Sequence, residues 1–158
     1  IVLEAKPFLT APLRELALLS GKYSRFQKDR RLKRKFELLY STWIEQSLTH
    51  KMADVVLLEN SQASPRGMIT LRTTSDHATV GLIAVSPRHQ RAGIGKRLIC
   101  AAENWLLQRS ITRLSIVTQV KNSVAINFYT KNSYIRASTQ QLYHLWRKPQ
   151  QRNTHLFI

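Results

Sequence analysis

The spacing of apolar residues predicts two helices in the first third of the chain. Apolar residues recur at steps of three and four over 11–20 and again over 32–48, which is the period of a helix with one buried face. Thr10 stands where an N-cap is expected for the first of these helices. The polar stretch 21–31 lacks the period and is interpreted as a loop, and a short strand is expected over 1–5.

After residue 53 the pattern changes to that of strands. Apolar runs rich in β-branched residues and one alternating stretch predict three strands, over 54–58, 67–73 and 78–85. Turn residues separate the three strands at hairpin length, so we expect an antiparallel meander.

The last part of the chain is expected to alternate helix and strand. The predicted elements are a helix over 94–110, a strand over 113–120, a short helix over 122–131, and one or two strands over 134–135 and 141–146. The whole is an α/β (α+β) arrangement, a mixed and mostly antiparallel sheet flanked by helices. One domain is expected over 1–147, followed by a polar tail over 148–158.

Positive charge is the most unusual feature of the composition. The 158 residues include 25 Lys and Arg against 9 Asp and Glu, a net charge of +16, and such an excess attracts polyanions. Between residues 25 and 35, only Asp29 opposes the basic residues Arg25, Lys28, Arg30, Arg31, Lys33, Arg34 and Lys35. This segment is either a solvated helix face or a surface for anionic groups, and the sequence leaves both interpretations open.

Cysteine content and apolar runs limit the class of protein. The single Cys100 excludes an internal disulfide and a metal cage built from cysteines, and no cluster of metal ligands is visible. No apolar run approaches about 20 residues and no signal peptide is evident. We therefore expect a cytoplasmic protein without a membrane span.

A glycine-containing loop follows the strand that ends at Val85. Pro87 stops that strand, because proline has no N–H to donate to a neighbouring strand. The residues from Gln90 to Gly95 read QRAGIG, and a strongly helical segment follows. A strand, a glycine loop and a helix N-terminus together present unpaired N–H groups that suit a phosphate or pyrophosphate. The spacing matches neither GxxxxGK[ST] nor GxGxxG.

The loop resembles the acetyl-CoA loop of the GCN5-related N-acetyltransferase (GNAT) superfamily, written [Q/R]xxGx[G/A]. Gln90, Gly93 and Gly95 occupy its three fixed positions, and the order of the predicted elements is that of the GNAT fold. The resemblance implies acetyl-CoA as cofactor, with the main chain of Ala84 and Val85 binding its pantetheine arm between two splayed strands. The residues implied in holding the pyrophosphate are Gln90, Arg91, Ala92, Gly93, Ile94, Gly95 and Lys96.

The predicted helix over 122–131 carries a candidate general acid. Acetyl transfer to an amine needs a neutral amine, a donor to the oxyanion and an acid for the departing thiolate. The segment NSVAINFYTK resembles the family's NxxAxxxY, in which the asparagine contacts the cofactor arm and the tyrosine lies near the sulfur. The resemblance assigns Asn122 and Ala125 to cofactor binding, and Tyr129 to cofactor binding and acid catalysis. The alternative is that Tyr129 only packs against Phe128.

No residue stands out as a general base. The candidates are Asp76, His77, His89, Glu103 and His144, and a surface or structural role explains each of them better. The amine is therefore expected to lose its proton to ordered water.

Further stretches indicate the acceptor. The tripeptide from Ser24 to Phe26, the helix around 43–45, and the pair at 118–119 resemble bacterial dTDP-fucosamine and related sugar-amine N-acetyltransferases. The resemblance implies a small-molecule amine as partner, in the first place an amino sugar on a nucleotide. The residues that it implies in substrate binding are Arg25, Phe26, Thr118 and Gln119.

Other functions stay open at this stage. The nearest alternative is a GNAT enzyme that acts on a small amine, an antibiotic or a peptide amine. A basic nucleic-acid-binding module and a catalytically silent acyl-CoA-binding module belong to other classes. Nucleic acid is disfavoured, because the aromatic residues fall mainly at helical core spacing rather than among the basic residues of strands. A homodimer is also left open.

Overall fold

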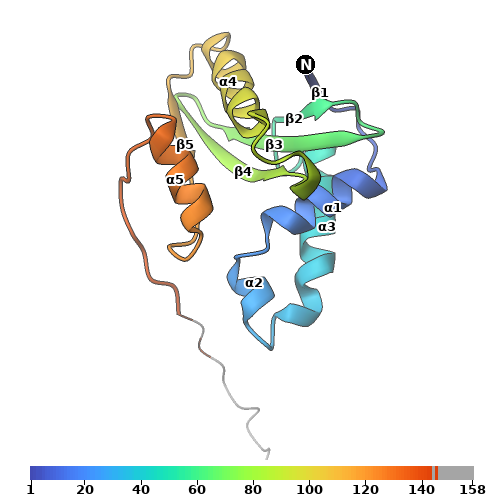
Figure 1. Ribbon diagram of the computed structural model, residues 1–158, viewed down its shortest axis with the longest axis vertical. Helices are drawn as coiled ribbons and strands as arrows, with labels where there is room; N and C mark the ends of the chain where they lie inside the picture. Colours follow the sequence, from blue (N-terminus) through green and yellow to red (C-terminus); the bar gives the residue numbers. More distant parts are fainter. Residues whose placement is uncertain (144, 146–158) are drawn as a thin grey trace, which may run out of the picture.

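The computed structural model describes residues 1–143 and residue 145, which form a sheet with helices around it (Figure 1). Its elements in chain order are β1 (Val2–Glu4), α1 (Ala11–Ser20), α2 (Arg25–Lys28), the 3-10 turn η1 (Lys33–Lys35), α3 (Phe36–Leu48), β2 (Val55–Asn60), β3 (Pro65–Thr73), β4 (His77–Val85), the 3-10 turn η2 (Pro87–His89), α4 (Ile94–Leu107), β5 (Arg113–Ile116) and α5 (Ser123–Lys131).

The strands form one mixed sheet in the order β1-β2-β3-β4-β5 (Figure 1). The strands β1 to β4 are antiparallel neighbours, whereas β5 runs parallel to β4. Parallel neighbours need a long crossover, and here α4 supplies it. The predicted antiparallel meander and the mixed sheet flanked by helices are confirmed.

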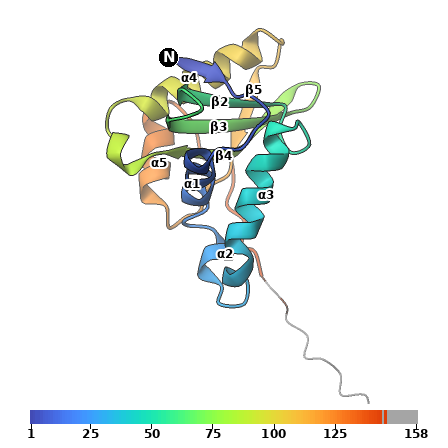
Figure 2. The same ribbon diagram turned by 90° about the vertical axis from the view of Figure 1, so that its right-hand side faces the viewer.

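Helices cover the two faces of the sheet and bury two separate apolar clusters (Figure 2). The helices α1 and α3 pack on one face and α4 on the other. Val56 and Leu58 of β2 belong to the cluster under α1 and α3, and Val55 and Leu57 belong to the cluster under α4. Because all four side chains are buried, β2 reads as an unbroken apolar run rather than an alternating one.

The strand β4 has a β-bulge opposite Thr70, where Gly81 and Leu82 together face a single residue of β3. The Thr70 side chain is buried, and its hydroxyl accepts a hydrogen bond from the Leu82 N–H at 2.8 Å. The extra residue reverses the alternation: Val80 packs under α4, whereas Leu82, two residues on, packs under α1 and α3. Bulges bend the strand that carries them, so β4 changes direction at this point.

The region between α1 and α3 differs from the predicted loop. Residues 25–28 form α2, whose N-cap Ser24 accepts a hydrogen bond from the Gln27 N–H at 3.3 Å. A helix of four residues is too short to show an apolar period, so periodicity does not find it. The helix α3 begins at Phe36 rather than at residue 32, because η1 precedes it.

The strands predicted beyond α5 are wrong for the described residues. None of residues 134–135, 141–143 and 145 is in a strand, because no neighbouring strand pairs with them. Residues 144 and 146, and the tail expected over 148–158, lie outside the described residues.

The elements β5 and α4 are shorter than predicted. The strand β5 ends at Ile116 rather than at residue 120, because β4 bends away and offers no partner beyond that point. The helix α4 ends at Leu107 rather than at residue 110, and Ser110 takes a left-handed backbone (φ +59°) in the turn that follows.

Two negative findings apply to the residues that the structure describes. No helix among them has both the length and the apolar character needed to cross a bilayer. No three His, Cys, Asp or Glu side chains among them are grouped so as to hold a metal ion.

Candidate functional site

The strands β4 and β5 lie side by side only at their beginnings. Residues 77–80 of β4 pair with residues 113–116 of β5, and the pairing stops there although β4 continues to Val85. The last pair comes directly before the bulge at Gly81 and Leu82, which bends β4 away from its neighbour. The second half of β4 therefore has an edge that no described strand covers. The splay that the resemblance implied is present.

The main chain of Val85 faces this open edge. The N–H groups of Leu82 and Ser86 both donate to β3. Backbone groups alternate in direction along a strand, so those of Ala84 face β3 as well, and those of Val85 face the open side. Of the two residues expected to hold the pantetheine arm, Val85 is the better placed.

Consecutive backbone N–H groups are unpaired just after this edge. Within the described part of the chain, none of the amides from Gln90 to Lys96 donates a hydrogen bond to the protein, and the next amide, that of Arg97, donates to the Gly93 carbonyl at 3.1 Å. Gly93 has φ +73°, a left-handed conformation that its missing Cβ permits. Unpaired amides and the positive end of the α4 dipole converge here, so the loop fits a pyrophosphate.

Side chains of the loop brace it rather than fill it. The Gln90 side-chain amide donates to the Val85 carbonyl at 3.2 Å, which joins the start of the loop to the end of β4. The Arg97 guanidinium donates to the Ala92 carbonyl at 3.0 Å. The Lys96 side chain is exposed, so its ammonium is placed to add positive charge beside the amides.

The remaining motif positions have packing roles that the sequence does not reveal. A Cβ at Gly95 would lie 3.1 Å from the ring of Phe128, so α5 packs directly on the first turn of α4. Ile94 is buried in the cluster under α4, so only its backbone is available to a ligand. The predicted cofactor contacts of Gly95 and Ile94 therefore concern their N–H groups.

The start of α5 brings four of the predicted residues together. Asn122 caps the helix: its Oδ1 accepts a hydrogen bond from the Ala125 N–H at 3.2 Å, and its Nδ2 donates to the Thr118 hydroxyl at 3.4 Å. The Asn122 N–H donates to the Gln119 carbonyl at 2.8 Å. The side chain of Asn122 is thus used for capping, and its contact with a cofactor stays a prediction.

The Tyr129 ring is half-buried among other aromatic rings. It packs edge-on against Phe128, with centroids 5.3 Å apart, and lies 6.0 Å from the ring of Tyr134. Burial raises the pKa of Tyr129 to about 12. The ring therefore packs against Phe128, and the hydroxyl keeps its proton at neutral pH, as a proton donor must, so both interpretations of Tyr129 stay predictions.

Tyr134 and Glu103 support Tyr129, and sequence reasoning missed both roles. The Tyr134 hydroxyl donates to the Glu103 carboxylate at 2.8 Å, and the Tyr134 N–H donates to the Tyr129 carbonyl at 3.0 Å. Burial, and then the Glu103 carboxylate, raise the pKa of Tyr134 above its ordinary value. Tyr134 was expected in a strand, and nothing in the sequence links it to a residue 31 positions earlier.

Two of the other groups considered as bases, His77 and Asp76, are engaged elsewhere, whereas the buried Nδ1 of His89 has no hydrogen-bond partner among the described residues. His77 Nε2 lies within hydrogen-bond distance of the Ser115 hydroxyl, at 2.7 Å, which joins β4 to β5. Asp76 pairs with Arg113. His144 lies outside the described residues.

The predicted acceptor residues lie on two separate elements. Arg25 and Phe26 are on α2, and Thr118 and Gln119 precede α5; both views show α2 set apart from α5 (Figures 1 and 2). Phe26 is partly buried against the cluster under α1 and α3, with the Arg25 guanidinium 5.0 Å from its ring centroid. Among the described residues, no hydrogen bond joins Arg25 or Phe26 to Thr118 or Gln119.

Residues 25–35, here called the basic segment, present all their cationic side chains to solvent. Every Lys and Arg in the segment is exposed. Arg30, Arg31 and Arg34 line one hollow together with Asp29. Exposed arginines at this density suit phosphate or carboxylate groups, which a guanidinium can bind with two hydrogen bonds.

Known proteins share these features in sequence and in fold. The acetyltransferase (GNAT) family matches residues 17–134. Streptothricin acetyltransferase from Escherichia coli is 36% identical over 66 residues, which are 41% of this chain and 38% of that protein. The matched part thus spans less than two fifths of that relative's length.

Two solved structures resemble this one over most of its length. The PaiA N-acetyltransferase from Thermoplasma acidophilum, in complex with coenzyme A, has a TM-score of 0.69 at 19% identity and covers 84% of this chain and 87% of its own. An aminoglycoside antibiotic 6′-N-acetyltransferase from Acinetobacter haemolyticus has a TM-score of 0.61 at 22% identity. The alignment covers 94% of this chain and 98% of that enzyme. At these identities the likeness establishes the fold.

The family match includes every element that shapes the site, from β4 through the loop and α4 to α5. The fold, the acetyltransferase class and the acetyl-CoA cofactor expected from the sequence are confirmed at the level of the family. The chain belongs to the acetyltransferase (GNAT) family.

Proposed function

We propose that this chain transfers the acetyl group of acetyl-CoA to a primary amine on a small anionic molecule, with an amino sugar on a nucleotide as the first candidate. The run of unpaired amides from Gln90 to Lys96, beside the open edge of β4, is the observation that supports acetyl transfer from acetyl-CoA. The positive charge of the basic segment supports an anionic acceptor.

The loop and the open edge supply the cofactor site. The amides of residues 90–96 and the dipole of α4 bind the pyrophosphate, and the Lys96 ammonium adds charge. The main chain of Val85 offers its N–H group to the pantetheine arm, while its carbonyl accepts a hydrogen bond from the Gln90 side chain. Acetyl-CoA, when bound, supplies an acetyl group on sulfur, which leaves readily from an acyl carbon.

Tyr129 is proposed as the proton donor. Its hydroxyl holds its proton at every physiological pH, because burial raises its pKa to about 12. Phe128 and Tyr134 pack against its ring and restrict its orientation. The hydroxyl therefore gives its proton to the departing sulfur only as the bond to carbon breaks, since free transfer to a thiolate of ordinary pKa, about 8.5, is uphill.

The basic segment selects the sign of the acceptor's charge. Aminoglycosides carry several ammonium groups, whereas a nucleotide sugar carries two phosphates. Two unit charges about 4 Å apart interact by about 1 kcal/mol in water and by about 4 kcal/mol near a protein surface. With one acidic residue against the many exposed cations of the basic segment, repulsion of a polycation outweighs its attraction.

An antibiotic amine is the second candidate acceptor. The curated relative is a streptothricin acetyltransferase, and one solved structure of the same fold is an aminoglycoside acetyltransferase. These names favour a cationic acceptor, so the two candidates differ in the charge that the site must accept.

The two candidates are separated by thiol release from acetyl-CoA with matched acceptors. We expect turnover of a nucleotide-linked amino sugar, weaker turnover of the same amino sugar without its nucleotide, and the weakest turnover of streptothricin and of an aminoglycoside. The double variant Arg30→Glu with Arg34→Glu should lower kcat/KM for the nucleotide-linked acceptor by about tenfold at low salt and by less at high salt.

A matched control carries the same change of net charge elsewhere. Lys6→Glu with Lys51→Glu replaces two exposed lysines outside the basic segment and should leave kcat/KM nearly unchanged. Faster turnover of the polycations than of the nucleotide-linked amine would exclude the anionic acceptor. Absence of thiol release with every acceptor would count against the transferase itself.

A further inference from the structure

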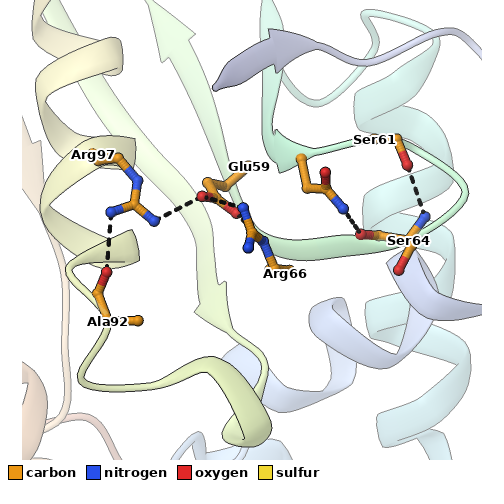
Figure 3. A network of polar contacts seen from close by, with 7 residues as sticks. Glu59, Ser61, Ser64, Arg66, Ala92 and Arg97 are labelled. Carbon is orange, nitrogen blue, oxygen red and sulfur yellow. Dashed lines mark hydrogen bonds and ion pairs between the residues drawn. The ribbon is translucent and has the colours of Figure 1, made fainter.

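A buried carboxylate on β2 binds the helix that follows the cofactor loop (Figure 3). The Glu59 side chain is 1% exposed. Arg66 of β3 donates to both its oxygens, at 2.8 and 3.0 Å, and Arg97 of α4 donates to Oε1 at 2.7 Å. Burial raises the pKa of a carboxyl, but here the hydrogen bonds and charges of Arg97 and Arg66 outweigh it and hold the pKa of Glu59 below its ordinary value.

Arg97 joins this carboxylate to the loop. One of its guanidinium nitrogens donates to Glu59, and the other donates to the Ala92 carbonyl at 3.0 Å (Figure 3). Ala92 lies between Arg91 and Gly93, which both have left-handed backbones, with φ +64° and +73°. A non-glycine residue in that conformation is unfavourable, so the turn needs a contact that holds it, and the Arg97 side chain makes one.

The ion pair between Arg97 and Glu59 also leaves Lys96, rather than Arg97, available to a phosphate. A buried carboxylate that loses a partner keeps an uncompensated charge, which is costly. The guanidinium of Arg97 therefore stays with Glu59 and Ala92, while the exposed Lys96 is not bound in this network. Arg97 lies next to Lys96 in sequence and has a different role.

We propose that Glu59 is a positioning residue for the loop 90–96 and acts on it through Arg97. The inference rests on the proposed function in one respect, that this loop binds the pyrophosphate of acetyl-CoA. Glu59 fixes the guanidinium, the guanidinium fixes the Ala92 carbonyl, and the amides on either side of that carbonyl keep the directions that a pyrophosphate needs. A residue on β2 thus sets the affinity for the cofactor without touching it.

The test compares Glu59→Gln and Arg97→Met with the control Arg66→Met. Arg66 shares the carboxylate with Arg97, is similarly exposed (39% against 45%) and has no hydrogen bond to the loop. The dissociation constant of coenzyme A, measured by calorimetry, should rise about tenfold in Glu59→Gln and in Arg97→Met. In Arg66→Met it should change by less than about twofold.

Limited trypsin digestion measures how well the loop 90–96 is held in place, and it needs no ligand. Cleavage after Arg91 reports on the loop, and cleavage after Arg30, in the basic segment of the same molecule, is the internal reference. The ratio of the two initial rates should rise about tenfold in Glu59→Gln and Arg97→Met, and stay within about twofold in Arg66→Met. Because Arg66 still pairs with both oxygens of Glu59 in Arg97→Met, this variant retains the fold even where Glu59→Gln does not.

The outcomes separate this inference from the proposed function. A purely structural Glu59 would lower the melting temperature and leave both the cleavage ratio and the coenzyme affinity unchanged, which overturns the proposal. If Arg97 bound the phosphate directly, Glu59→Gln would free it, and coenzyme A would bind as well as before or more tightly; that result also overturns it. Wild-type protein that binds no coenzyme A would refute the proposed function, while the cleavage ratio would still decide whether Glu59 holds the loop.

Discussion

The protein holds its two basic regions in opposite ways. In the loop region, Arg97 is bound to a buried carboxylate 38 positions earlier in the chain and to the carbonyl of Ala92. In the basic segment the cationic side chains are all exposed, and the backbone is held by hydrogen bonds between residues at most four apart. Arg97 is fixed by tertiary contacts, whereas the hydrogen bonds of the basic segment are local and Phe26 packs the segment against the core.

This difference matches what each region is proposed to bind. A cofactor has one shape, so a loop fixed from the core of the sheet suits it. Acceptors differ from enzyme to enzyme, and the exposed cationic side chains of the basic segment can change without disturbing the core. The comparison predicts that substitutions in the loop region affect binding and catalysis strongly, and that those in the basic segment leave the fold intact.

The largest effect is expected at Tyr129, in the cofactor region. Tyr129→Phe removes the proposed proton donor and keeps the ring that packs against Phe128. We expect kcat to fall about 100-fold, with the KM for acetyl-CoA within about twofold of wild type. Steady-state kinetics measure both values. Tyr134→Phe, which loses only the bond to Glu103, should change kcat less than about threefold, and an equal loss in both variants would assign the effect to packing.

The pH profile tests the same hydroxyl. Because burial raises the pKa of Tyr129 to about 12, the acid stays protonated as the pH rises to about 10, so deprotonation of this group should cause no fall in kcat over that range. A fall of kcat with a midpoint near pH 9 that disappears in Tyr129→Phe would contradict the raised pKa.

A smaller effect is expected from the backbone of the loop. Gly93→Val places a β-branched side chain at φ +73°, where it is strongly disfavoured. We expect the dissociation constant of coenzyme A to rise about tenfold. Arg91→Gly is the converse substitution, because it places glycine where a non-glycine residue has a left-handed backbone. It should not lower the melting temperature. Equal affinity in Gly93→Val and wild type would show that the turn does not need this conformation.

The pH dependence of stability should report on the fixed region. The pKa of Glu59 lies below its ordinary value of 4.5, so its ionised form adds stability that is fully present above about pH 4.5 and is lost as the pH falls through the folded-state pKa. Glu59→Gln should therefore lose less stability than wild type between pH 6 and pH 3, as urea unfolding would measure. Glu15→Gln, at an exposed glutamate, should keep the wild-type slope.

The smallest effect on folding is expected in the basic segment. Arg30→Gln with Arg34→Gln replaces two exposed side chains, so the free energy of unfolding should change by less than about 0.5 kcal/mol. Urea unfolding at neutral pH measures it. A loss of more than about 1 kcal/mol would mean that these two arginines stabilise the fold, and the contrast between the two regions would fail.

Periodicity predicted most of the fold because each element buries one face over several turns or alternations. The helices α1, α4 and α5 and the strands β2 to β4 all begin within two residues of the predicted position. The failures occur where structure depends on a partner. The strand β5 is short because β4 bends away, and the residues after α5 remain outside the sheet because no strand pairs with them. Propensity alone does not determine pairing.

The candidate site divides in the same way. The sequence predicts the residues from Gln90 to Gly95 because a loop motif is contiguous, and Asn122 and Tyr129 because they belong to one helix and its N-cap. Glu59 was missed, since its partners lie on two other elements. One signal was available: a charged residue directly after the apolar run VVLL of a buried strand indicates a buried ion pair, because an unpaired carboxylate is rarely tolerated there.

The open edge of β4 depends on the number of residues in the strand, because one extra residue forms the bulge after which β4 and β5 no longer pair. Deleting Gly81 would restore strict alternation, and β5 would then have a straight neighbour to follow past Val80. The gap between the two strands would then close, while Leu82 would stay opposite Thr70 in the layer under α1 and α3. Designers who transplant this sheet can vary its side chains widely, but must keep that one supernumerary residue.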